Sequence, residues 1–190
     1  GLTQSELEIL GAKLGSDVPF CIGGGTAIAT GRGEQLSALP SLENIYIVLA
    51  KYRSIAVSTP WAYTTHRQEF ENIYNKDTQS LAARAAAVHS RDIVKAIVNR
   101  DTKEVAQFMY NDLEKVVMSK YALVLELKEV FVNLGVLGTM MSGSGPSVFA
   151  LCESKQQAEE IKYNVRKTIP NQDLELFVSQ LIGHGIQLVP

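Results

Sequence analysis

The sequence has little cysteine, few histidines and no apolar run long enough to cross a bilayer. Its two cysteines, Cys21 and Cys152, are far apart and lack the paired spacing of a zinc site. We therefore expect two reduced thiols and no structural metal. The three histidines are also scattered without ligand spacing, and the first residues have neither a basic region nor an apolar core, so we expect no signal peptide.

The charge balance is nearly even, with 18 basic and 20 acidic residues and a net charge of -2. No basic stripe marks a nucleic-acid surface, so we expect neither a nucleic acid nor a membrane as partner. What is present is ordinary globular composition, with 46% hydrophobic residues in a chain of 190. A chain of this length can bury a sizeable core, and it suggests one domain or one domain plus part of another. We expect a cytoplasmic protein, or a plastid stromal one if the source is a plant.

Hydrophobic spacing and breaker residues predict short elements in the first half of the chain. Thr3 and Glu6 have the spacing of a capping box that would begin a helix over residues 3–14. Ser58 or Thr59 followed by Pro60 is typical of another helix start. The expected elements are a helix over 3–14, strands over 26–30 and 45–50, and a helix over 60–73.

The second half mixes helical spacing with two strands around a glycine-rich turn. Its apolar residues follow a 3,4 pattern over residues 112–134, which predicts one long helix. The expected elements are helices over 79–88, 90–99, 101–109, 112–134 and after Ser154, and strands over 136–141, 147–152 and 174–182, with 185–189 as a possible extension. Such an order favours an α+β fold, with helices packed on one face of a mostly antiparallel sheet.

The glycine-rich stretch Met141–Ser147 joins two apolar strands. Glycine permits positive φ and close approach of backbone to a ligand, and successive N–H groups in such a turn can bind an anion. The stretch is not a Walker loop, because no Gly-Lys-Ser/Thr follows it. From the residues alone, a turn beside a phosphate and a plain hairpin turn both remain open.

Asp17 lies at a glycine–proline break, in Gly15-Ser16-Asp17-Val18-Pro19. A carboxylate there can face a substrate hydroxyl and accept its proton during phosphoryl transfer. The alternative is a helix cap or an Asx-turn, which Asp often forms.

Two aromatic residues, Trp61 and Tyr63, stand at the start of the helix that follows Thr59. Either could stack on a base, although core packing is the more common use of a Trp. Asn111 and Asp112 have the sequence position of a cap for the long helix.

Taken in order, these segments resemble the GHMP kinases, and among them the kinases of the non-mevalonate, methylerythritol phosphate route to isoprenoids. Gly15–Phe20, followed by Gly23–Ala27 and Gly31–Glu34, resembles the segment that carries the catalytic Asp of that family. Val57–Tyr63 resembles its segment beside the cytidine, and Asn111–Glu114 its Asn-Asp-Leu/Phe-Glu motif. Met141–Gly145 resembles the third GHMP motif.

The resemblance implies ATP-dependent, magnesium-assisted phosphorylation of a hydroxyl of the small molecule 4-diphosphocytidyl-2-C-methyl-D-erythritol. It implies Asp17 as proton acceptor, Tyr63 stacked on cytosine with Thr59 nearby, and Gly143, Ser144 and Gly145 supporting the phosphate end. It implies no metal ligand among these residues. The implied fold is the ferredoxin-like C-terminal domain of a GHMP kinase plus the tail of its N-terminal domain. A homo-oligomer remains open.

The resemblance also implies missing parts, because no Pro-x-x-x-Gly-Leu-x-Ser-Ser phosphate loop is present. We therefore expect residues 1–40 to be a remnant of the N-terminal domain and residues 41–190 to be the C-terminal domain. We expect the chain to be inactive by itself. The alternatives are another GHMP small-molecule kinase, such as a homoserine or mevalonate kinase, and a ferredoxin-like binding module without catalysis.

Overall fold

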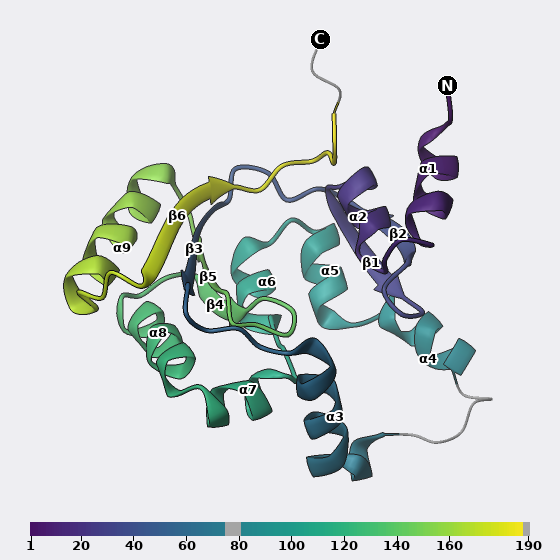
Figure 1. The fold of residues 1–190 in the computed structure, drawn as a ribbon. Helices are drawn as coiled ribbons and strands as arrows, with labels where there is room; N and C mark the ends of the chain where they lie inside the picture. The colour runs from purple at the N-terminus through teal and green to yellow at the C-terminus, as the bar shows by residue number, and fades with distance from the viewer. Residues whose placement is uncertain (75–80, 188–190) are drawn as a thin grey trace. The chain divides into compact units, whose positions relative to one another are not determined.

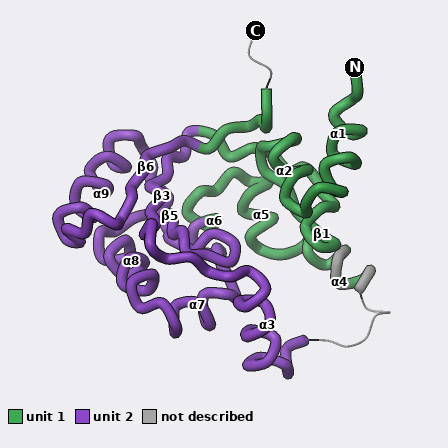
Figure 2. The backbone as a smooth tube through the Cα atoms, viewed as in Figure 1, with its two compact units in different colours: residues 1–43, 79–105, 181–190 green, residues 44–78, 106–180 purple. Residues whose placement is uncertain are grey.

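The computed structural model describes residues 1–74 and 81–187, which form two compact units (Figure 2). Unit 1 takes the described residues of 1–43, 79–105 and 181–190, and unit 2 those of 44–78 and 106–180. One division between the units, at 43/44, lies three residues from the predicted domain boundary at 40/41. That boundary stays a prediction, since compact units and inherited domains need not coincide.

Unit 2 is built on a four-stranded antiparallel sheet (Figure 1). The strands are β3 (Tyr46–Tyr52), β4 (Gly138–Met141), β5 (Val148–Cys152) and β6 (Leu174–Gln180). Their order in the sheet is β4-β5-β3-β6, and β3 pairs with both β5 and β6. This order, with helices between β3 and β4 and between β5 and β6, is the split β-α-β arrangement of a ferredoxin-like fold. The predicted α+β class with an antiparallel sheet is confirmed.

Two helices, α8 (Ala122–Asn133) and α9 (Lys155–Thr168), cover one face of this sheet (Figure 1). Side chains alternate across a strand, so every second residue of β3 and β5 faces these helices. Val48 and Val148 are fully buried on that face, where Phe131 of α8 and Val165 of α9 join the same hydrophobic cluster. The remaining helices that belong wholly to unit 2 are α3 (Thr59–Glu69), the 3-10 turn η1 (Glu71–Ile73) and α7 (Glu114–Lys120).

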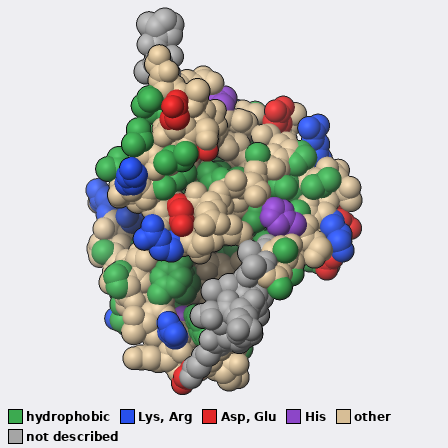
Figure 3. All heavy atoms as spheres, turned by 90° about the vertical axis from the view of Figure 1, so that its right-hand side faces the viewer, with side chains coloured by type: hydrophobic (Ala, Val, Ile, Leu, Met, Phe, Trp, Pro, Cys, Tyr) green, Lys and Arg blue, Asp and Glu red, His purple; other side chains and the backbone are tan. Residues whose placement is uncertain are grey.

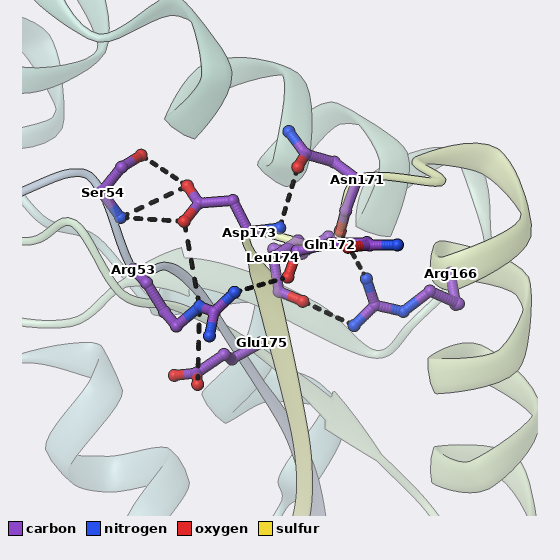
Figure 4. A network of polar contacts seen from close by, with 8 residues as sticks. All are labelled: Arg53, Ser54, Arg166, Asn171, Gln172, Asp173, Leu174 and Glu175. Atoms are coloured by element: carbon purple, nitrogen blue, oxygen red, sulfur yellow. Dashed lines mark hydrogen bonds and ion pairs between the residues drawn. The ribbon is translucent and has the colours of Figure 1, made fainter.

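A polar network joins the end of β3 to the start of β6 (Figure 4). The Asp173 carboxylate accepts from the Ser54 N–H at 3.1 Å, and the Arg53 guanidinium donates to the Gln172 carbonyl at 3.1 Å. Arg166 at the end of α9 donates to the carbonyls of Asn171 and Leu174, at 2.6 and 2.5 Å. The Arg53 and Arg166 bonds satisfy backbone carbonyls in the loop before β6 and at its first residue, and so stabilise the position where β6 begins.

Unit 1 begins with two short helices and a two-stranded sheet. Its elements are α1 (Gln4–Gly11), α2 (Val18–Gly23), β1 (Thr26–Thr30), β2 (Gln35–Leu39), α4 (Leu81–Val88) and α5 (Asp92–Val98), and α6 (Thr102–Phe108) runs from unit 1 into unit 2. Thr3 caps α1 in a complete capping box with Glu6, as predicted. The antiparallel pair β1–β2 turns at residues 31–34, where Gly31 and Gly33 have positive φ.

The segment after β6 returns to α2 within unit 1. The Gly185 N–H donates to the Gly23 carbonyl at 3.1 Å, and the Ile186 N–H to the Cys21 carbonyl at 3.0 Å. Gly24, at φ +66°, permits this approach, since a Cβ there would lie 2.0 Å from the Gly185 nitrogen. Residues 185–187 form no strand; the rest of the proposed extension, 188–189, lies outside the described residues.

Large apolar side chains of α1 and its flanks lie in solvent. Leu7, Ile9, Leu10 and Leu14 are all exposed, with Leu14 85% exposed. Figure 3 shows hydrophobic side chains at the surface on the side of the molecule that carries α1. Across the described ranges, no helix is long and apolar enough to cross a membrane.

The structure corrects one predicted element and adds two, α2 and β2, that were not predicted. The single helix over 112–134 is wrong, because Tyr121 leaves helical geometry between α7 and α8. Its ring packs edge-on against Trp61, and its hydroxyl donates to the Ala56 carbonyl at 3.4 Å. Strand β2 was not predicted at all, since Gln35–Leu39 carries only a weak apolar alternation.

Candidate functional site

The glycine-rich turn connects β4 to β5 in unit 2, as the sequence predicts. Gly143 and Gly145 have φ of +55° and +77°, which an L side chain rarely adopts. A Cβ on Gly145 would lie 2.5 Å from the Met141 sulfur, whereas one on Gly143 would meet no atom within 4 Å. Gly145 is therefore needed for packing as well as for its backbone conformation, while Gly143 borders open space.

Side chains of the segment Asn111–Glu114 hold the start of this turn. The Asn111 amide donates to the carbonyls of Met141 and Gly143, both at 2.8 Å. The Glu114 carboxylate accepts from the Met141 N–H at 2.7 Å and pairs with Lys128 of α8. Asn111 therefore does not cap a helix as predicted, since α7 starts after Leu113 and has no side-chain cap.

Thr59 and Ser144 come together from positions 85 residues apart. Their hydroxyl oxygens lie 2.8 Å from each other, and either could donate. Thr59 is the first residue of α3, where the Ser58 hydroxyl accepts from the Trp61 N–H and Pro60 occupies the first turn, as predicted. Two of the predicted groups, the start of this helix and the glycine turn, are thus neighbours.

The two aromatic residues of this segment differ in how exposed their rings are to solvent. Tyr63 is 57% exposed, so a face of its ring is open to a planar ligand. Trp61 is half-buried, packs against Tyr121, and has the Lys120 ammonium 4.1 Å from its ring centroid. That cation occupies the π-face a base would need. Tyr63 is therefore the better candidate for stacking.

Asp17 belongs to unit 1 and stands at the N-cap position of α2. Its carboxylate makes no capping hydrogen bond, and among the described residues it has no hydrogen-bond or ion-pair partner. The 31–33 turn lies close by, since a Cβ on Gly33 would be 3.8 Å from an Asp17 carboxylate oxygen. The side chain is exposed and makes no side-chain cap, and its role as a base stays a prediction.

A group that sequence reasoning missed surrounds Asp112. His66 is 2% exposed; its Nδ1 lies 2.7 Å from the Tyr74 hydroxyl and its Nε2 lies 3.8 Å from the Asp112 carboxylate. Burial would raise the pKa of Asp112, but hydrogen bonds from Lys115 and Tyr110 outweigh it and lower that pKa. Two stretches of sequence, residues 66–74 and 110–115, meet here, so no local spacing could have revealed the group.

Comparison with known proteins now identifies the domain. Residues 93–171 match the family described as GHMP kinases C terminal. Residues 93–171 are therefore similar to the C-terminal domain of GHMP kinases. The matched range includes Asn111, α7, α8, the glycine turn and α9. It therefore contains the side chains that hold the turn and the two helices that cover the sheet.

Relatives with a narrower name align with nearly the whole of this chain. The 4-diphosphocytidyl-2-C-methyl-D-erythritol kinase of Nostoc punctiforme is 68% identical over 189 residues, covering 99% of this chain and 60% of the relative. The kinase of the same name from Trichodesmium erythraeum is 54% identical over 188 residues, again 99% of this chain and 60% of the relative. The chain thus spans about three-fifths of the length of these relatives.

Solved structures agree on the GHMP kinase fold. A 4-(cytidine 5'-diphospho)-2C-methyl-D-erythritol kinase superposes with a TM-score of 0.66 at 24% identity, covering 94% of this chain and 57% of the other. The homoserine kinase of Cytophaga hutchinsonii gives a TM-score of 0.59 at 22% identity, covering 88% of this chain and 51% of the other. At these identities the likeness shows the fold alone.

Proposed function

We propose that a protein containing this chain transfers the γ-phosphoryl group of ATP to a hydroxyl of 4-diphosphocytidyl-2-C-methyl-D-erythritol. The observation that carries the proposal is the 68% identity, over nearly the whole chain, to a kinase of that name. The open glycine turn beside Thr59 suits a reaction in which positioning and charge stabilisation supply most of the catalysis. The reaction would take place in the cytoplasm, or in the plastid stroma if the source is a plant.

In this proposal Asp17 accepts the proton of the attacking hydroxyl as its oxygen approaches the γ-phosphorus. Tyr63 stacks on the cytosine ring, and Thr59 lies near the same end of the substrate. Gly143, Ser144 and Gly145 support the phosphate end. The unpartnered Asp17 carboxylate and the 57% exposure of Tyr63 support these assignments.

The glycine turn fits the polyphosphate of ATP in one specific respect. Within the described residues, the N–H groups of Gly143 and Ser144 donate to no acceptor, and free N–H groups in a glycine turn attract phosphate oxygens. Magnesium bound to a nucleotide is held mainly by phosphate oxygens and water, with one or two carboxylates from the protein. The described residues contain no group of three or more His, Cys, Asp or Glu side chains that could hold a metal ion by themselves, so no residue of this chain is assigned to magnesium. We assign it no step.

The test is a kinase assay on a chimaera. It joins this chain to the part of the Nostoc punctiforme relative with which the chain does not align. We expect the chimaera to form ADP only with the cytidine substrate and the 190-residue chain alone to give no turnover. Turnover with homoserine or mevalonate in place of the cytidine substrate would contradict the proposal. A chimaera that folds but phosphorylates none of these alcohols would favour a binding module.

Single substitutions in the chimaera test the two main roles. Asp17→Asn should lower kcat by about 10²- to 10⁴-fold, with Asp92→Asn as an exposed control on α5.

Tyr63→Ala should raise KM for the cytidine substrate roughly 5- to 100-fold, with Tyr163→Ala, 69% exposed on α9, as the control. An unchanged KM in Tyr63→Ala would refute the stacking role.

A further inference from the structure

The Asn111 side chain uses both of its donors and one of its acceptor positions on two backbone segments. Both amide hydrogens are donated to carbonyls of the glycine turn, those of Met141 and Gly143. The amide oxygen accepts from the Leu113 N–H at 3.0 Å. With two acceptors on one side and a donor on the other, the network leaves only one orientation for the amide.

This clamp fixes the direction of one peptide plane in the turn. In a trans peptide the carbonyl and the following N–H point to opposite sides. Because the Gly143 carbonyl points to Asn111, the Ser144 N–H is directed away from Asn111. This N–H has no acceptor among the residues that the structure describes.

The clamp is itself anchored to the helical layer of unit 2. Glu114 is largely buried, accepts from the Met141 N–H, and forms an ion pair with Lys128 of α8. On the other side of the turn, the Ser144 hydroxyl is held by Thr59 of α3. The Gly143–Ser144 peptide is therefore restrained from both sides, while its free N–H stays unpaired.

We propose that Asn111 is a positioning residue that holds the Ser144 N–H ready for a phosphate oxygen of the nucleotide. The ligand in this inference rests on the proposed function, whereas the orientation rests on the contacts alone. Asn111 acts through the turn and need not touch the substrate. An Asx-turn would be the purely structural role for the same residue, because its oxygen also accepts from the Leu113 N–H.

Asn111→Asp separates these two roles. The carboxylate of Asp accepts from the Leu113 N–H as well as the amide oxygen of Asn does. A purely structural role therefore predicts little change in the conformation of the turn. A carboxylate cannot donate, however, and it would face the two carbonyl oxygens of Met141 and Gly143. Asn111→Ala removes both functions, and Asn133→Ala at the exposed end of α8 is the control.

The first measurement is amide hydrogen exchange on the 190-residue chain itself. The Gly145 N–H donates to the Ser142 carbonyl at 2.9 Å, so its protection reports whether the turn is closed. We expect it to exchange at least tenfold faster in Asn111→Asp and Asn111→Ala, with β5 still protected. Exchange at wild-type rates in Asn111→Asp would overturn the positioning role, whatever the activity.

The second measurement is the steady-state kinetics of the same variants in the chimaera. Misplacing one donor should lower kcat roughly tenfold to a hundredfold and leave KM for the cytidine substrate near the wild-type value. Faster exchange of the Gly145 N–H together with an unchanged kcat would overturn the inference. Absence of turnover in the unsubstituted chimaera would refute the proposed function, and the exchange measurement would still decide the orientation.

Discussion

The two compact units differ in how their apolar side chains are covered. Every member of the hydrophobic core cluster belongs to unit 2, from Val48 on β3 to Leu176 on β6. In unit 1, α1 is held by its capping box and leaves Leu7, Ile9 and Leu10 in solvent. Burial of apolar surface is the main stabilising term in folding, so unit 2 has the more self-sufficient architecture. The proposed proton acceptor is in unit 1 and the proposed phosphate turn is in unit 2.

The largest effect should come from truncating the core of unit 2. Phe131→Ala removes a fully buried ring and should lower the free energy of unfolding by about 3–5 kcal/mol. Leu14→Ala, at a side chain 85% exposed in unit 1, should change it by less than about 0.5 kcal/mol. Urea unfolding followed by circular dichroism measures both values. Equal decreases in the free energy of unfolding of the two variants would show that the two units do not differ in how much their apolar side chains contribute to stability.

A glycine substitution tests what holds unit 1 together. Gly24→Ala and Gly31→Ala both introduce a side chain at positive φ, at a cost of about 1 kcal/mol each. The Cβ at Gly24 would also overlap the backbone of His184 and Gly185, whereas that at Gly31 meets only the flexible end of Glu34. We therefore expect Gly24→Ala to be the more destabilising of the two.

The same substitution has a local signature. Gly24→Ala should break the hydrogen bonds that Gly185 and Ile186 donate to the α2 segment, and so speed their amide exchange. Gly31→Ala should leave that exchange unchanged, and β3 in unit 2 should stay protected in both variants. If the protection of Gly185 survives in Gly24→Ala, the return of the chain to α2 does not depend on this glycine.

The smallest effect concerns the two thiols, one in each unit. Cys21 is exposed, whereas Cys152 is fully buried on β5, and burial raises the pKa of the Cys152 thiol from 9.0 to about 11. At pH 8 a disulfide reagent should label one thiol per native chain and two per unfolded chain, since only a thiolate reacts. The variant Cys21→Ser should show no labelling until unfolding. Rapid labelling of native Cys21→Ser would show that the unit 2 core opens easily.

The raised pKa of Cys152 also predicts a direction for stability at alkaline pH. The folded chain binds this proton more tightly than the unfolded chain does. Its contribution is therefore complete below pH 9 and is lost as the pH rises from 9.0 to about 11. Cys152→Ala should reduce the dependence of the free energy of unfolding on pH between 9.0 and about 11, as measured by urea unfolding across that range.

Local patterns predicted those features that depend on a few neighbouring residues. The Thr3–Glu6 capping box, the Pro60 helix start and the helix after Ser154, which is α9, are all as expected. The helix over 112–134 failed because its apolar spacing continues through Tyr121, where the backbone leaves helical geometry and the side chain contacts Trp61 and the Ala56 carbonyl. Spacing alone cannot distinguish one straight helix from two that pack against each other.

The sequence by itself determined the α+β class and the glycine turn between two strands, because residue propensities, caps and hydrophobic periods act over short distances. It also pointed to Asp17, Thr59, Tyr63 and Gly143–Gly145, whose functional roles stay predictions. Only the tertiary structure decided that Thr59 meets Ser144 across 85 positions and that Asn111 donates to the turn instead of capping a helix. The reason is physical: an amide or a hydroxyl bonds to whichever partner the packed backbone brings within about 3 Å.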